Sequence, residues 1–149
     1  MMLMTSVVLL SGCSALIGEE VGRLSVEKPA VDDNQLNEVS TTIDLTKGES
    51  VAIWTDMDLE YEGNVRYVFR SSLITPSQDT LFTEIDPEDR SITIGEMSTT
   101  WMGETSTSYE GKAFDYTAEE DGTHTITAYF VVSDAERIAV NKADLVLRK

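Results

Sequence analysis

Alternation of apolar and polar residues is the dominant pattern in the last two thirds of the chain. Across residues 51–61 every second residue is apolar or threonine, and the residues between them are mostly acidic. A period of two sustained over this length is typical of a half-buried β-strand, because successive side chains of a strand point to opposite faces. The same pattern recurs in shorter stretches, at residues 42–45, 65–74, 81–85, 92–94, 112–118, 124–132 and 143–147.

Turn signals separate these apolar stretches. They contain Gly, Asn or Pro and lie at residues 47–48, 63–64, 75–78, 86–89 and 119–122. Short strands with turns between them predict an all-β fold, a single antiparallel β-sandwich over residues 40–149. A domain of about 110 residues is large enough to fold around one core without disulfides.

The two longest strands follow each other along the chain, and we expect them to pair. Residues 51–61 and 65–74 would form a hairpin through a three-residue loop at 62–64. This register pairs Asp56 with Arg70 on the polar face. A two-residue loop would instead place acids among aromatic residues, and a shift of one residue moves every side chain to the other face.

The first 17 residues are mostly apolar and carry no charged side chain. Small and polar residues interrupt this run, which is shorter than the roughly 18 apolar residues that suggest a spanning helix. An apolar run followed by small residues is typical of a secretory signal peptide. From residue 14 to 39 the apolar residues follow no period, so we expect a flexible tether, with a docked strand at residues 22–26 as the alternative.

The end of the apolar run, Leu10-Ser11-Gly12-Cys13, resembles the lipobox of bacterial lipoproteins. The resemblance implies a signal peptide at residues 1–12, lipidation of Cys13, and a tether over residues 13–39. It also implies attachment to a membrane through the N-terminal lipid, at the outer membrane because Ser14 rather than Asp follows the cysteine. Each buried acyl CH₂ contributes about 0.8 kcal/mol, so two or more chains anchor stably. The alternative is a buried cysteine on a core helix.

Two stretches of the domain resemble immunoglobulin-like sandwiches of bacterial surface proteins. Residues 45–51 are similar to the turn between the first two strands of that family, and residues 120–126 to the corner before its penultimate strand. His124 stands where that family often has a tyrosine. Similar stretches occur in jelly rolls, so the resemblance implies an immunoglobulin-like or jelly-roll-like sandwich.

Composition and charge narrow the classes of function. The chain of 149 residues has 11 Lys and Arg against 27 Asp and Glu, a net charge of -16. Phosphate backbones repel such a chain, so we expect no nucleic-acid partner. One Cys and one His exclude a disulfide framework and a zinc site built from several such ligands. We expect no cofactor, and His124 shares a strand face with Ile126, which indicates a structural role rather than acid–base chemistry.

Trp54, Trp101 and Met102 are the candidate contacts for a ligand or partner. Trp54 lies on the polar face of its strand, where an exposed ring can stack on a sugar; the alternative is that the tether or another strand covers it. Trp101 and Met102 belong to a Ser/Thr-rich stretch at residues 98–108. This stretch is either a mobile loop with an apolar tip or an edge strand whose Trp101 closes the end of the core.

Asp56, Asp58 and Glu60 are weak candidates for a calcium site. Carboxylates on one face of a strand lie about 7 Å apart, and Ca²⁺ prefers oxygen ligands. Calcium sites normally wrap a loop around the ion, however, so we expect no metal and favour a solvated face with paired charges.

The sequence thus predicts a membrane-anchored envelope lipoprotein that acts as a non-catalytic interaction module for another envelope protein. A glycan-binding module using Trp54 or Trp101 is the first alternative, and a hydrolase is the second. Accessible Trp rings would favour a glycan, an exposed apolar patch or unpaired edge strand would favour a protein partner, and a deep pocket near His124 would favour an enzyme.

Overall fold

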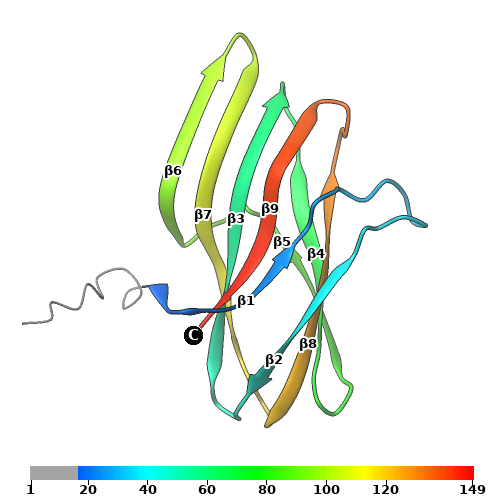
Figure 1. Ribbon diagram of the computed structural model, residues 1–149, viewed down its shortest axis with the longest axis vertical. Coiled ribbons are helices and arrows are strands. Elements are labelled where there is room, and N and C mark those ends of the chain that lie inside the picture. The colour runs from blue at the N-terminus through cyan, green and yellow to red at the C-terminus, as the bar shows by residue number, and fades with distance from the viewer. Residues whose placement is uncertain (1–16) are drawn as a thin grey trace, which may run out of the picture.

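The computed structural model describes residues 17–149, which form two antiparallel β-sheets packed face to face (Figure 1). One sheet has five strands in the order β1-β9-β3-β7-β6, and the other has four in the order β2-β8-β4-β5. The predicted all-β sandwich is confirmed. The strands are β1 (Glu20–Ser25), β2 (Val39–Leu45), β3 (Ser50–Glu62), β4 (Tyr67–Ile74), β5 (Thr80–Ile85), β6 (Ile92–Trp101), β7 (Glu104–Thr117), β8 (Gly122–Val132) and β9 (Ile138–Arg148).

The core lies between the two sheets and consists of residues that the alternation places on one face of each strand. In β3, Ile53, Met57 and Leu59 are buried. In the opposite sheet, Phe69 of β4 packs on Phe130 of β8 with ring centroids 4.8 Å apart. Burying a side chain of this size contributes about 1.5–3 kcal/mol, so burial of the inner faces of both sheets stabilises the sandwich.

β3 and β4 do not form the expected hairpin. β3 pairs with β7 and β9 in the five-stranded sheet, whereas β4 pairs with β5 and β8 in the other. The expected pairing of Asp56 with Arg70 is therefore wrong: Asp56 binds Arg23, and Arg70 binds Glu84. Alternation determines which face of a strand is buried, but the choice of partner strand depends on how the two whole sheets close over the core.

Part of the expected tether is a strand. β1 pairs antiparallel with β9, and the side chains of Leu24 and Val26 are buried in the core. The flexible tether expected over residues 13–39 is wrong for this segment, and the alternative of a docked strand at 22–26 is confirmed. Two apolar residues on one face were too short a pattern to distinguish a strand from a linker.

The order of the last strands differs from that of immunoglobulin domains. In those domains the last two strands lie in the same sheet. Here β8 belongs to the four-stranded sheet and β9 to the five-stranded sheet. The similarity to immunoglobulin-like sandwiches is therefore limited to two packed antiparallel sheets.

At one end of the sandwich, β6 and β7 join in a hairpin whose turn lies beside the end of β3 (Figure 1). Its ladder is regular from the pair Met97–Ser108 to the pair Trp101–Glu104. We call residues 97–108 the apical hairpin. Its strand β6 lies at the edge of the five-stranded sheet, with β7 as its neighbour.

Candidate functional site

The apical hairpin ends in a two-residue turn formed by Met102 and Gly103. Both residues have positive φ, 50° and 82°, as a type I′ turn requires. Glycine adopts this conformation freely, whereas an L-residue with a side chain pays about 1–2 kcal/mol for it. Met102 is 88% exposed, so packing on the rest of the protein does not offset this strain.

Trp101 and Met97 are exposed on the same edge strand. Their exposed fractions are 77% and 75%. Residues 98–108 form an edge strand, a turn and the strand that follows it, which agrees with the expected edge strand rather than with a mobile loop. Trp101, however, does not close the end of the core. β6 makes its substantial contacts with β7, because it is an edge strand of the five-stranded sheet.

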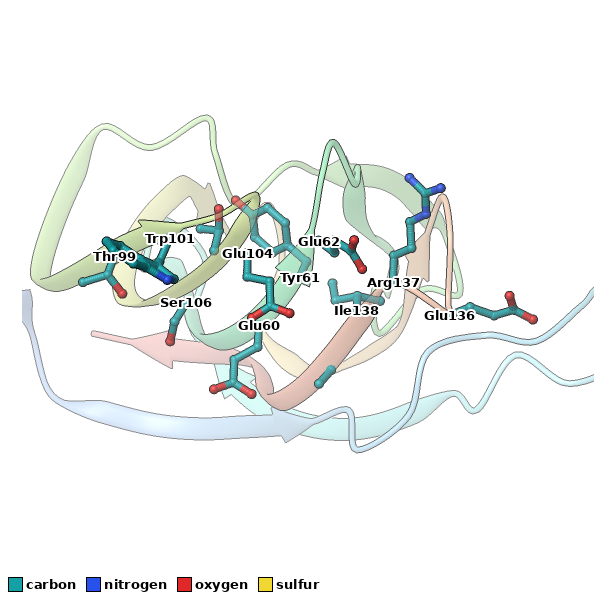
Figure 2. A pocket seen from close by; sticks show the side chains of 12 residues that line it. Glu60, Tyr61, Glu62, Thr99, Trp101, Glu104, Ser106, Glu136, Arg137 and Ile138 are labelled. Carbon is teal, nitrogen blue, oxygen red and sulfur yellow. The ribbon is translucent and has the colours of Figure 1, made fainter.

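A shallow depression of about 480 Å³ lies between the apical hairpin and the start of β9. Figure 2 shows Trp101 and Thr99 on one side of it and Arg137 with Ile138 on the other, with carboxylates between them. We call it the apical depression. Its ionisable lining residues, apart from Tyr61, are Glu60, Glu62, Glu104, Glu136 and Arg137.

The lining of the apical depression carries more negative than positive side chains. Glu62 of β3 lies directly opposite Glu104 of β7. Within residues 17–149, none of the four glutamates has a Lys or Arg at ion-pair distance, and the guanidinium of Arg137 binds Asp134 at 3.2 Å instead. Like charges directly opposite each other on adjacent strands are destabilising, so this end of the sheet favours an added cation.

Another carboxylate pair on the same sheet is neutralised. Asp56 of β3 lies opposite Asp144 of β9. Arg23 of β1 binds both, at 2.9 and 2.7 Å, and the Nζ of Lys142 lies 3.6 Å from Asp56. Burial alone would lower the pKa of Arg23, but its hydrogen bonds to these carboxylates and Glu20 outweigh burial and raise the pKa, so the bridge stays charged.

The three calcium candidates occupy alternate positions of β3 with different surroundings. Asp56 is bound by Arg23, Asp58 accepts a hydrogen bond of 3.4 Å from Asn141, and Glu60 lines the apical depression. Across residues 17–149, no three acidic, His or Cys side chains gather in a group that could hold a metal ion. The acidic face of β3 is therefore partly paired and partly open.

Trp54 is not available to a ligand, because only 1% of its surface is exposed. It lies in register between Lys112 of β7 and Val146 of β9, and the guanidinium of Arg148 is 5.7 Å from its ring centroid. Arg148 also donates to the carbonyl of Gly18, which brings the segment before β1 to the same place. The proposal of Trp54 as a contact residue is wrong, and the covered alternative is correct.

His124 is fully buried near the start of β8. Its Nδ1 lies 3.0 Å from the carbonyl oxygen of Gly122, and its ring meets the edge of Tyr116 at 5.8 Å between centroids. The buried position of His124 agrees with the structural role that its place on the strand face predicts.

A cluster of hydrogen-bonded rings supports the base of the apical hairpin. Tyr67 of β4 and Tyr109 of β7 both donate to the carboxylate of Glu88, in the loop between β5 and β6. The guanidinium of Arg90 stacks on Tyr109, 3.7 Å from its ring centroid. Burial, followed by the hydrogen bond to Glu88, raises the pKa of Tyr67, and burial raises that of Tyr109.

Sequence reasoning missed a groove of about 440 Å³ on the outer face of the four-stranded sheet. Its main aromatic residues are Phe82, which is 80% exposed, and the half-buried Tyr129, with Arg70 in register between Tyr129 and Glu84. Phe82 occupies a polar-face position of an alternating strand, and an aromatic residue at such a position was the signal that could have revealed the groove.

Cys13 and the expected signal peptide at residues 1–12 fall outside the described residues 17–149. Within that range, no helix is long and apolar enough to cross a membrane. Comparisons of the chain with models of protein families, with curated proteins and with solved structures gave no match.

Proposed function

We propose that the chain is an envelope lipoprotein, anchored in the outer membrane through Cys13, that acts as a non-catalytic protein-interaction module. The partner, another envelope protein, docks on the apical hairpin. The observation that carries this proposal is the edge of β6. In the described part of the chain this edge has no neighbouring strand, and it ends in the exposed side chains of Trp101 and Met102.

Beyond the irregularity at Gly95 and the charge of Glu96, the edge of β6 lacks the features that normally prevent pairing with other chains. An open sheet edge is a template for another strand, and proteins usually protect it with charges, proline or very short strands. Residues 97–102 are Met-Ser-Thr-Thr-Trp-Met, with no charge and no proline. Aromatic residues and Met are also enriched at protein interfaces.

Two destabilising features coincide at this end of the molecule. Met102 has a positive φ without compensating contacts, and Glu62 faces Glu104. Strained backbone positions cluster at functional sites, where another interaction offsets the strain. Both features support a docking role for the apical hairpin.

Photo-crosslinking in the cells that produce the protein tests the docking site. A photoreactive residue is placed at Trp101, and in a matched control at Phe82, which is similarly exposed on the other sheet. We expect a discrete crosslinked protein from position 101 and none from position 82. Crosslinks that are absent at 101, or equal at both positions, would contradict the proposal.

Cell fractionation tests the anchor separately. Cys13→Ser removes the acceptor thiol and should release the protein from the membrane fraction, whereas the neighbouring control Ser14→Ala should leave it there. Membrane association of Cys13→Ser equal to that of the control would rule out the lipid anchor.

Glycan binding is the second candidate function, and the groove at Phe82 favours it. The aromatic side chains of Phe82 and Tyr129 lie on one face of the four-stranded sheet, beside the hydroxyls of Ser72 and Thr127. Aromatic rings with neighbouring hydroxyl groups can stack on a sugar and hydrogen-bond to it. If a glycan array detects binding that Phe82→Ala abolishes and Trp101→Ala preserves, this second function is the correct one.

A further inference from the structure

We infer that the partner supplies an extended, cationic segment that adds to β6 as a new strand, with its Lys or Arg side chains over the apical depression. This inference rests on the proposed function and specifies the mode of binding and the chemistry of the partner. Neither the lipobox nor the sandwich fold implies either property.

The free edge has a defined usable length. The register of β6 against β7 shifts between Ile94 and Met97, where Gly95 has a φ of 62°. Beyond this irregularity the ladder runs without interruption from Met97 to Trp101. Five residues of strand offer about 17 Å of backbone hydrogen-bonding groups. An added segment therefore pairs with residues 97–101 and not with the start of β6.

The charge beside the edge selects a cationic segment. Neighbouring strands lie about 4.8 Å apart, so a strand added to β6 runs roughly 10 Å from β7. A long Lys or Arg side chain on it can cross the exposed ring of Trp101 and approach Glu104, which lies opposite Trp101 on β7. A cation there gains the attraction of an aromatic face and relieves the repulsion between Glu104 and Glu62.

A second copy of the chain is a poor occupant of the same edge. Each copy carries a net charge of -16. Pairing β6 with its own copy would bring two acidic depressions together and leave the charge of both uncompensated. Complementary charge therefore favours a different, basic partner.

Peptide binding to the intact protein in detergent solution tests the inference. The probe is a peptide of alternating lysine and threonine, about ten residues long so that it covers the free edge. We expect saturable binding that weakens as ionic strength rises. The peptide of alternating glutamate and threonine should not bind.

Two sets of variants separate strand addition from nonspecific charge attraction. On the protein, the double variant Glu62→Gln, Glu104→Gln should bind about tenfold more weakly, while Glu119→Gln, at the opposite end of the sandwich, should not differ from the native chain. On the peptide, N-methylation removes backbone donors without changing charge. Methylation of one alternate set of residues should abolish binding, and methylation of the other set should preserve it.

Several results would overturn the inference. Equal binding by both N-methylated peptides would exclude strand addition, and equal weakening by Glu119→Gln would exclude a specific role for the apical depression. A stable dimer in sedimentation that Trp101→Lys converts to a monomer would assign the edge to a second copy. Crosslinking from position 101 without any peptide binding would refute this inference alone, whereas absence of both would refute the proposed function as well.

Discussion

Glu62 and Glu104 face each other across β3 and β7 with no bridging cation in the described part of the chain. Asp56 and Asp144 face each other in the same way across β3 and β9, but they share Arg23. The five-stranded sheet therefore contains two carboxylate pairs: Arg23 neutralises the pair of Asp56 and Asp144, and it does not neutralise the pair of Glu62 and Glu104. The difference between them places the binding site at the apical end of the sheet and leads to opposite predictions for the two pairs.

Removing one charge of the open pair should stabilise the isolated protein. Glu104→Gln relieves the cross-strand repulsion and should raise the free energy of unfolding by about 0.5 kcal/mol at low salt. The gain should shrink as added salt screens the charges. Urea denaturation at two ionic strengths measures both effects, and a loss of stability at low salt would contradict the account.

Removing the bridge of the neutralised pair should destabilise the protein. Arg23→Met leaves two buried carboxylates opposite each other and should lower the free energy of unfolding by about 2 kcal/mol. Adding Asp144→Asn to this variant should recover part of the loss. A double-mutant cycle measured by denaturation tests the coupling, and strictly additive effects of the two substitutions would show that the bridge contributes nothing.

The turn of the apical hairpin should accept a more favourable residue. Asn tolerates positive φ better than Met, so Met102→Asn should stabilise the protein by about 1 kcal/mol. The same change removes an exposed apolar side chain, and we expect it to weaken partner capture in the crosslinking assay. If the variant is more stable and captures the partner equally well, Met102 is not part of the docking surface.

The two buried tyrosines predict a loss of stability in alkaline solution. Their hydroxyls have raised pKa values in the folded protein, so the folded state retains protons that the unfolded state releases from about pH 10 upward. The stabilisation is present below that pH and is lost as the pH rises further, by up to about 1.4 kcal/mol per pH unit for each tyrosine.

Denaturation between pH 8 and pH 11, a range chosen to bracket about one unit on either side of the tyrosine value, measures this loss. Tyr67→Phe should reduce the slope of stability against pH relative to the native chain. Its hydroxyl also donates to Glu88, so a lower stability at pH 8 is expected as well. An unchanged alkaline slope would contradict the assigned burial of Tyr67.

Local patterns in the sequence predicted the strands and their buried faces but not their neighbours. The alternation at residues 51–61 identified the core face of β3, which includes Met57 and Leu59. It could not show that β3 pairs with β7 and β9, because pairing depends on segments far along the chain. For the same reason, the sequence could not show that Glu62 and Glu104 lie opposite each other.

The exposure of individual aromatic residues was equally difficult to predict. Trp54 and Trp101 both belong to strands, yet one is covered and the other is free. The difference arises because Trp54 lies on a central strand beside Arg148, whereas Trp101 lies on an edge strand. Such differences depend on the order of the strands in the sheet, which no periodicity encodes.

Amide hydrogen exchange is the most direct test of the central claim that β6 is a docking edge. The intact protein is compared alone and in complex with the partner captured at position 101. We predict slower exchange of backbone amides at residues 97–101 in the complex and no change in the edge strand β1. Unchanged exchange at 97–101, or protection confined to the sheet that carries Phe82, would contradict the account.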